Sequence, residues 1–186
     1  MAPSTQPQRS IAPSLEARIA GALYLLSIIT GIFAEKFATG TPSLVANLVG
    51  DGCYVGVTLI LYDLLKPVNR NLSLLAALFS LAGCTTIAVR VLNLLSLPIN
   101  GIVFFGFYCV LLAYLIFKST FLPRFLSVLL TITGIGWLTY LSPALGHALF
   151  PYLMITGLLG EGSLTLWLLI FGVNAQRWSE QSRASA

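Results

Sequence analysis

The stretch that decides the fold is residues 148–173, which read ALFPYLMITGLLGEGSLTLWLLIFGV. It holds one charged residue, Glu161, among side chains that are nearly all apolar. A helix needs ~20 mostly apolar residues to cross the hydrocarbon layer of a bilayer. The stretch is therefore predicted to be a transmembrane helix with a carboxyl group near its middle.

The rest of the chain has a similar composition. Of its 186 residues, 57% are hydrophobic and only 9% are charged, whereas a soluble domain usually carries ~25% charged residues. A small domain has too much surface to hide so many apolar side chains inside, so lipid must cover them. We therefore predict an all-α polytopic transmembrane bundle of about six helices, at residues 17–35, 43–65, 71–96, 100–117, 123–141 and 148–173. The third helix either ends near Leu92 or tilts to fit the bilayer.

The predicted bundle forms one transmembrane domain over residues 17–174, and the two ends of the chain differ from it in composition. Residues 1–16 are rich in Pro, Ser and Gln and are predicted to be a disordered tail, and residues 175–186 form a C-terminal tail. Six spans put both termini on the same side of the membrane. That side carries eight basic residues and the other side carries two, and the side richer in basic residues is usually the cytoplasmic one. We expect the protein to lie in a cell inner membrane, with both termini in the cytoplasm. The net charge of +4 belongs to membrane ends, so nucleic acid is not an expected partner.

Glu161 is the first candidate for chemistry. An ionisable side chain in hydrocarbon costs several kcal/mol and usually faces protein or water. No basic residue is expected at its depth, so we expect a neutral carboxyl group that donates a hydrogen bond. Such a group is either a general acid or a fastener to a neighbouring helix.

Asp51 is the second candidate. It lies ~10 Å inside the second predicted helix at 1.5 Å per residue. Spacings of three and four place it on one polar stripe with Asn47, Tyr54, Thr58 and Tyr62.

Arg90 and Asn93 share a face near the same end of the third predicted helix. Neighbouring helices joined by a short turn are antiparallel, so an ion pair between Asp51 and Arg90 is predicted. The pair either locks two helices together or keeps Asp51 ionised, and Arg90 is also suited to an anionic head group.

Glu35 and several aromatic residues complete the predicted site. Glu35 ends the first predicted helix and is either an interfacial carboxylate or a substrate contact. Phe105, Tyr108, Trp137 and Tyr140 fit interfacial belts and ordinary packing. Aromatic faces also stabilise a cation, so they suit a substrate that passes through a cationic intermediate.

Other residues exclude several kinds of site. The single His147 excludes a haem held by two histidines and most zinc sites, and the three cysteines lack metal-ligand spacing. No lysine lies in the middle of a span, which excludes a retinal Schiff base. We expect no cofactor and no metal.

Four stretches carry a resemblance to a known family. They are Ala17–Tyr24 continuing to Glu35, LYDLLKPVN at residues 61–69, FFGFYC at residues 104–109 with FLPR at residues 121–124, and Gly160–Asn174. Together they resemble the bacterial membrane-protein family of the domain of unknown function 4386. That family implies a multi-helix membrane protein and says little about activity. Its members tend to have a longer segment before FFG, often with a histidine, where this chain has only residues 96–100, so it looks like a shortened member.

Three functions remain open at this point. The first is a membrane-embedded enzyme, such as a cyclase or isomerase, acting on a lipophilic, isoprenoid-like small molecule by acid–base chemistry, with Glu161 or Asp51 as the acid. The second is a small transporter or proton-coupled carrier, in which the same residues mark a polar path. The third is a non-catalytic scaffold subunit, in which they fasten helices. The bilayer is an expected partner in all three, and a homo-oligomer stays open.

Overall fold

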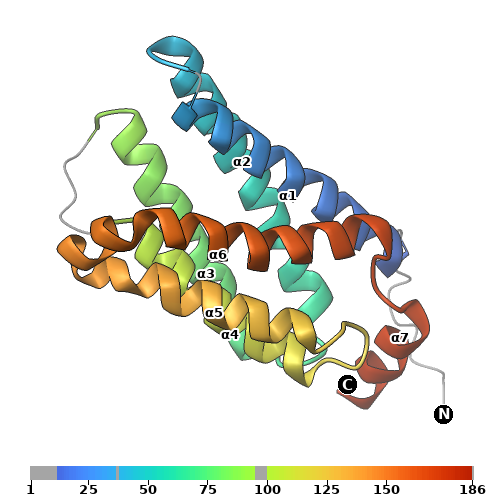
Figure 1. The fold of residues 1–186 in the computed structure, drawn as a ribbon. Helices are drawn as coiled ribbons and strands as arrows, with labels where there is room; N and C mark the ends of the chain where they lie inside the picture. The colour runs from blue at the N-terminus through green and yellow to red at the C-terminus, as the bar shows by residue number, and fades with distance from the viewer. Residues whose placement is uncertain (1–11, 37, 95–99, 186) are drawn as a thin grey trace.

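The computed structural model describes residues 12–36, 38–94 and 100–185 (Figure 1). Within these residues the chain forms seven α-helices and one 3-10 turn, and no strand. In order they are α1 (Pro13–Lys36), α2 (Thr41–Leu65), α3 (Arg70–Val91), α4 (Ile102–Lys118), α5 (Phe125–Leu138), η1 (Thr139–Leu141), α6 (Pro143–Ile170) and α7 (Ala175–Ala184).

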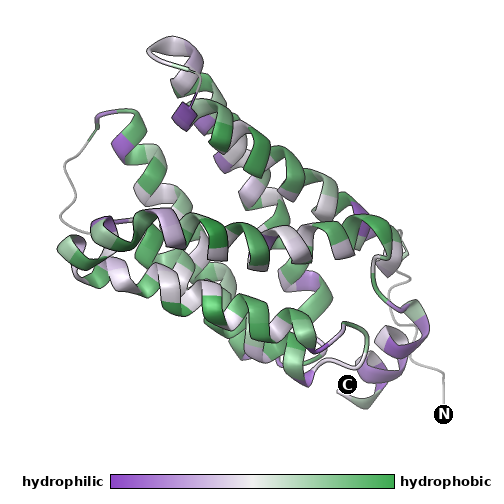
Figure 2. Ribbon diagram, in the orientation of Figure 1, coloured by the Kyte–Doolittle hydropathy of each residue, from purple (hydrophilic) through white to green (hydrophobic). Residues whose placement is uncertain are grey.

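Four helices are long and apolar enough to cross a membrane: α1, α2, α3 and α6, with 24, 25, 22 and 28 residues. The apolar helices α4 and α5 are shorter, with 17 and 14 residues, and η1 extends α5. Figure 2 shows hydrophobic residues along these helices and hydrophilic residues gathered at their ends and on α7. The predicted polytopic transmembrane bundle is confirmed, with four full-length spans and two short apolar helices.

The six apolar helices form a ring. Each packs against the one before it, and α6 returns to pack against α1. Consecutive helices are antiparallel: Thr58 of α2 bonds Ser80 of α3 at 2.6 Å, while Ser73, earlier in α3, bonds the carbonyl of Tyr62, later in α2, at 3.0 Å. The ring brings side chains from all six helices to its centre.

The ends of three elements differ from the predicted ends. The first helix begins at Pro13 rather than residue 17, so residues 13–16 are helical; residues 1–11 of the predicted tail lie outside the described residues. The sixth begins at Pro143 rather than residue 148, because proline is well suited to the first helical turn. The third ends at Val91, which is the earlier of its two predicted ends.

Asn93 explains where α3 stops. It has a φ of 54°, and its N–H bonds the carbonyl of Arg90 at 3.0 Å while the N–H of Leu94 bonds the carbonyl of Val89 at 3.0 Å. These two bonds form the Schellman arrangement that closes a helix, in which asparagine is the usual alternative to glycine. Asn93 therefore ends α3 rather than extending its polar face.

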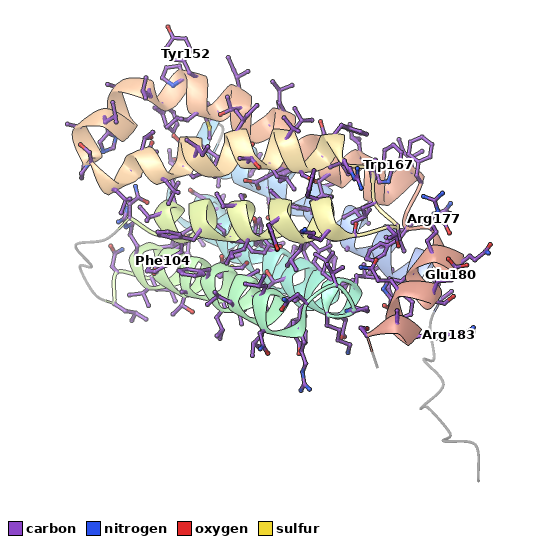
Figure 3. All side chains as sticks on the ribbon, turned by 90° about the horizontal axis from the view of Figure 1, so that it is seen from below. Phe104, Tyr152, Trp167, Arg177, Glu180 and Arg183 are labelled. Carbon is purple, nitrogen blue, oxygen red and sulfur yellow. The ribbon has the colours of Figure 1, made fainter. Side chains whose placement is uncertain are left out.

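α7 is an addition that the sequence analysis treated only as a tail. Asn174 caps it by accepting a bond from the N–H of Arg177 at 3.1 Å. Trp178 donates to the carbonyl of Leu64 at 2.9 Å, and Gln181 accepts from the hydroxyl of Thr120 at 3.0 Å. Figure 3 shows Arg177, Glu180 and Arg183 projecting from this helix, whose polar side chains gather at one end of the bundle.

The bundle has two unlike halves. We call the half next to α7 the proximal half, and the half that contains Lys36, Thr41, Val91 and Pro143 the distal half. The proximal half is closely packed by side chains that are at most 1% exposed, namely Leu61, Leu64, Leu112, Leu126, Leu164 and Leu168. Hydrophobic side chains on the outside, such as Tyr152 of α6, point away from the bundle (Figure 3).

Candidate active site

A cavity of about 420 Å³ lies in the distal half and reaches the middle of the bundle. All six helices of the ring contribute to its wall. Seven of the residues singled out from the sequence line it: Glu35, Asn47, Asp51, Tyr54, Phe105, Trp137 and Glu161. Most of the remaining wall is aliphatic or aromatic, which is the composition expected of a small-molecule site.

Glu161 lies at the deep end of the cavity, held by three uncharged donors. The indole N–H of Trp137 donates to its Oε1 at 3.0 Å, and the hydroxyl of Tyr24 donates to its Oε2 at 2.9 Å. The thiol of Cys109 lies 3.8 Å from Oε1. Within the described residues Glu161 has no ion pair. Both oxygens are thus held in place without a cation.

Glycines in α1 and α6 place two of these donors. A Cβ on Gly157 would lie 2.5 Å from Cζ2 of Trp137, so only glycine lets the indole lie against α6 one turn before Glu161. A Cβ on Gly21 would lie 2.5 Å from the backbone nitrogen of Leu169, so α1 and α6 touch along their backbones there. That contact brings Tyr24, one turn further along α1, within reach of Glu161.

Tyr24 also links Glu161 to a group of aromatic rings. Its hydroxyl lies 3.1 Å from that of Tyr54, which donates to it because the hydrogen of Tyr24 is given to Glu161. The ring of Tyr54 packs edge-on against Phe105, with centroids 4.8 Å apart, and lies 6.1 Å from Tyr108. Tyr54 therefore has one side on the cavity and the other in the buried ring cluster.

Asp51 occupies the opposite wall of the same cavity, on α2. Its carboxyl group faces the thiol of Cys84 on α3. Gly50, immediately before it, lies against Thr30 of α1, where a Cβ would come within 2.6 Å of the hydroxyl oxygen. This contact between α1 and α2 helps to fix the turn of α2 that directs Asp51 inward.

Arg90 and Asn93 lie off the wall of this cavity. Asp51 and Arg90 form no ion pair within the described residues, so the predicted pair is wrong; Arg90 is exposed and does not line the cavity. Asn93 lies in a separate hollow between the tips of α2 and α3. α3 passes the level of Asp51 at Cys84, so Arg90 lies six residues further along α3, ~9 Å nearer the distal end at 1.5 Å per residue, and Asn93 lies beyond the end of the helix.

Two predicted aromatic residues also lie off the cavity wall. Tyr108 is 2% exposed and is packed behind Tyr54. Tyr140 lies in the 3-10 turn at the distal end, where its ring packs against His147 with centroids 5.7 Å apart. They support the site through packing and the shape of the distal end.

Tyr24, Cys109 and most of the aliphatic wall were not predicted to be site residues. Tyr24 lies on the same helix face as Ser27, Gly31 and Glu35, and all three of these residues line the cavity. The position of Tyr24 on the face of Glu35 was therefore a signal in the sequence. Cys109 offered no signal, because a buried thiol in an apolar helix looks the same whether or not it meets an acid.

The arrangement is suited to proton transfer in an apolar chamber. If Glu161 gives up its proton, the resulting carboxylate keeps hydrogen bonds from Trp137 and Tyr24, and such fixed donors stabilise developing charge strongly where water is excluded. The rings of Tyr54, Phe105 and Trp137 line the same cavity, and aromatic rings stabilise a positive charge that lies over their faces.

Comparisons with known proteins agree with the fold. The chain matches the family described as Domain of unknown function (DUF4386) over residues 42–100 and 97–172. The match is divided at residues 97–100, within the segment that the sequence analysis found to be short; residues 95–99 lie outside the described part of the structure. An uncharacterized protein of Archaeoglobus fulgidus is 33% identical over 127 residues, which are 63% of this chain and 76% of the relative. No solved structure matches. The chain belongs to the DUF4386 family of membrane proteins.

Proposed function

We propose that this protein is a membrane-embedded enzyme that acts on a lipophilic, isoprenoid-like substrate by carboxylic acid chemistry, as a cyclase or isomerase does. The observation that carries the proposal is that Glu161 and Asp51 line one aromatic-walled cavity inside an apolar bundle. Acids in such a place are costly, and they are found mainly where they are used. A fastening role alone would not need an open cavity between them.

Glu161 is the proposed acid. Its O–H bond breaks as a C–H bond forms on a substrate alkene, which leaves a carbocation on the substrate and a carboxylate on Glu161. Trp137, Tyr24 and Cys109 stabilise the carboxylate through the contacts described above. Loss of a proton from a neighbouring carbon to Asp51, or back to Glu161, ends the reaction with a shifted double bond or a new ring.

The closed proximal half favours a reaction chamber over a transport path. Beyond Glu161 the helices are packed by leucines that are at most 1% exposed. A carrier needs a polar route that reaches the second surface, whereas the hydroxyls buried among these leucines, those of Thr58, Ser80 and Thr165, bond to each other or to the backbone of their own helix.

We also propose that the α7 end faces the cytoplasm of a cell inner membrane. Among the described residues seven basic side chains lie at that end, Arg18, Lys66, Arg70, Lys118, Arg124, Arg177 and Arg183, and two, Lys36 and Arg90, lie at the distal end. This is the asymmetry that orients membrane proteins. The cavity then opens in the outer half of the membrane.

Deuterium incorporation tests the proposed chemistry without knowing the product. The protein in lipid nanodiscs is incubated in D₂O with linear isoprenoid alkenes, and carbon-bound deuterium is measured by mass spectrometry. An acid that protonates an alkene leaves deuterium on carbon. We expect incorporation with the unaltered protein and its loss with Glu161→Gln.

Glu180→Gln is the matched control, because Glu180 is an exposed carboxylate on α7 (Figure 3). It should leave incorporation unchanged. No incorporation from any alkene by the folded, unaltered protein would overturn the proposal, as would equal incorporation by the Glu161→Gln variant.

A further inference from the structure

The ring of helices is open on one side, in the distal half, between α1 and α6. In the proximal half these two helices touch: Gly21 lies against the backbone of Leu169, and Tyr24 bonds Glu161. Further along, Ile28, Gly31 and Ile32 of α1 and Phe150 and Met154 of α6 line the cavity instead. Figure 1 shows α1 and α6 close together near α7 and diverging toward the other end.

Exposure at this place confirms that nothing in the described residues covers it. Ile32 is 48% exposed and Met154 is 43% exposed, although both line the cavity. No described atom lies within 4 Å of a Cβ built on Gly31. The cavity therefore opens sideways, between two helices that are long and apolar enough to cross a membrane.

The helices on either side hold this opening in place. α1 stays with α2, through Thr30 against Gly50 and through Ser43, which donates to the carbonyl of Ala34 at 3.2 Å. α6 stays with α5, where Thr133 donates to the carbonyl of Thr156 at 2.7 Å beside Gly160. In the distal half α1 is therefore held by α2, and α6 is held by α5. The two helices keep their places without contacting each other there.

The polar side chains are arranged along the cavity in a way that limits what it takes. Glu35, Lys36, Asn47 and Asp51 line its distal part, while the lateral opening and the middle are aliphatic and aromatic. Two carboxyl groups beside one lysine favour a hydroxyl or ammonium head and disfavour a phosphate. A volume of about 420 Å³ is at the small end of ligand sites and has room for one chain, not for a two-chain phospholipid.

We propose that the cavity is loaded sideways from the lipid, through the opening between α1 and α6, by a single-chain amphiphile with a hydroxyl or ammonium head. The head lies at Glu35, Asn47 and Asp51, and the chain extends toward Glu161. This rests on the proposed function for the chemistry that follows, but the binding itself does not depend on that chemistry.

Photolabelling tests the proposal directly. Diazirine-bearing analogues of farnesol, farnesylamine and farnesyl phosphate are added to the protein in nanodiscs, and labelled peptides are mapped by mass spectrometry. The alcohol and the amine are expected to label α1 and α6 around Ile32 and Met154 and to reach Glu161. Labelling by the phosphate equal to that by the alcohol would overturn the assignment of the head group.

Two glycines give a matched pair of variants. Gly31→Phe places a ring in the opening, and Gly52→Phe places the same ring on α2, where a Cβ also meets no described atom within 4 Å and the residue does not line the cavity. Labelling of the cavity should fall about tenfold with Gly31→Phe and stay within about twofold with Gly52→Phe. Equal labelling of the two variants would overturn the lateral route.

Glu161→Gln separates this inference from the proposed reaction. The variant should keep its photolabelling on α1 and α6 while losing deuterium incorporation. Labelling as expected with no incorporation by the unaltered protein would reject the chemistry and keep the binding site, whereas incorporation with no labelling at the opening would reject the route and keep the chemistry.

Discussion

The proximal and distal halves are built from the same six apolar helices, yet one is closed and the other holds a cavity. In the proximal half, leucines fill the centre, and Gly21 lets α1 and α6 meet backbone to backbone. In the distal half the same two helices are apart, and Glu35, Asp51 and Glu161 line the space. Apolar surface alone does not bring helices together in lipid, so their spacing is decided by small residues and interhelical bonds.

The largest contrast is expected between two aliphatic side chains of α6. Leu164 is fully buried in the proximal half, and Met154 is 43% exposed on the cavity wall. Leu164→Ala should lower the free energy of unfolding by ~2–5 kcal/mol, because it leaves a void in a packed region. Met154→Ala should lower it by less than ~1 kcal/mol, because its surroundings are already open. SDS titration in mixed micelles, followed by circular dichroism, measures both; equal losses would contradict the division into halves.

Two glycines of α1 give the next contrast. Gly21→Ala puts a methyl group 2.5 Å from the backbone of Leu169, so it should destabilise the protein by ~1–3 kcal/mol through overpacking. Gly31→Ala meets no described atom and should stabilise it by ~0.5–1 kcal/mol, since alanine is the better helix former. The same titration measures both variants. A loss of stability with Gly31→Ala would show that α1 is covered there.

Tyr24 tests the bond that joins the halves at Glu161. Tyr24→Phe removes the donor to Oε2 and the partner of the Tyr54 hydroxyl. Leaving buried polar groups without a partner costs ~1–3 kcal/mol, and the matched change Tyr114→Phe, at a tyrosine that is 49% exposed, should have almost no effect. If the two variants have the same unfolding midpoint, the hydrogen bonds of Glu161 contribute little to the stability of the bundle.

The smallest effect is expected at the α7 end. Trp178→Phe removes the bond to the carbonyl of Leu64, which is worth ~0.5–1.5 kcal/mol. Because the lost bond ties α7 to the end of α2, hydrogen exchange should quicken for amides of Ala175–Ala184 and stay unchanged in α5. Faster exchange throughout the bundle would show that α7 supports the whole proximal half rather than lying on it.

The membrane helices were readable from the sequence because lipid imposes a simple length rule. Each span needs a long apolar run. Prolines mark the ends of such runs: Thr41-Pro42 at the start of α2, Pro67 just after its end, and Pro143 at the start of α6. A charged residue inside such an apolar run is easily recognised, so Asp51 and Glu161 were identified as candidate site residues.

The directions in which the helices face were not readable in the same way. A helix that is apolar all round carries no stripe that says which side is inward. The Asp51–Arg90 pair was therefore predicted from depth alone, and it fails because Asp51 lies level with Cys84, six residues before Arg90 on α3. Tyr24 and Cys109 meet Glu161 only because Gly21 and the ring closure bring α1 and α4 to α6, and contacts over such sequence separations are not visible in one chain.

The central claim is that Glu161 lies at the end of a cavity that lipid-soluble molecules can reach. Treatment with dicyclohexylcarbodiimide, a membrane-soluble reagent that attacks protonated carboxyl groups, tests it most directly, with the modified residue located by mass spectrometry. The account predicts modification at Glu161, slowed by farnesol and by Gly31→Phe but not by Gly52→Phe. Modification confined to surface acids such as Glu180, with Glu161 untouched, would contradict it.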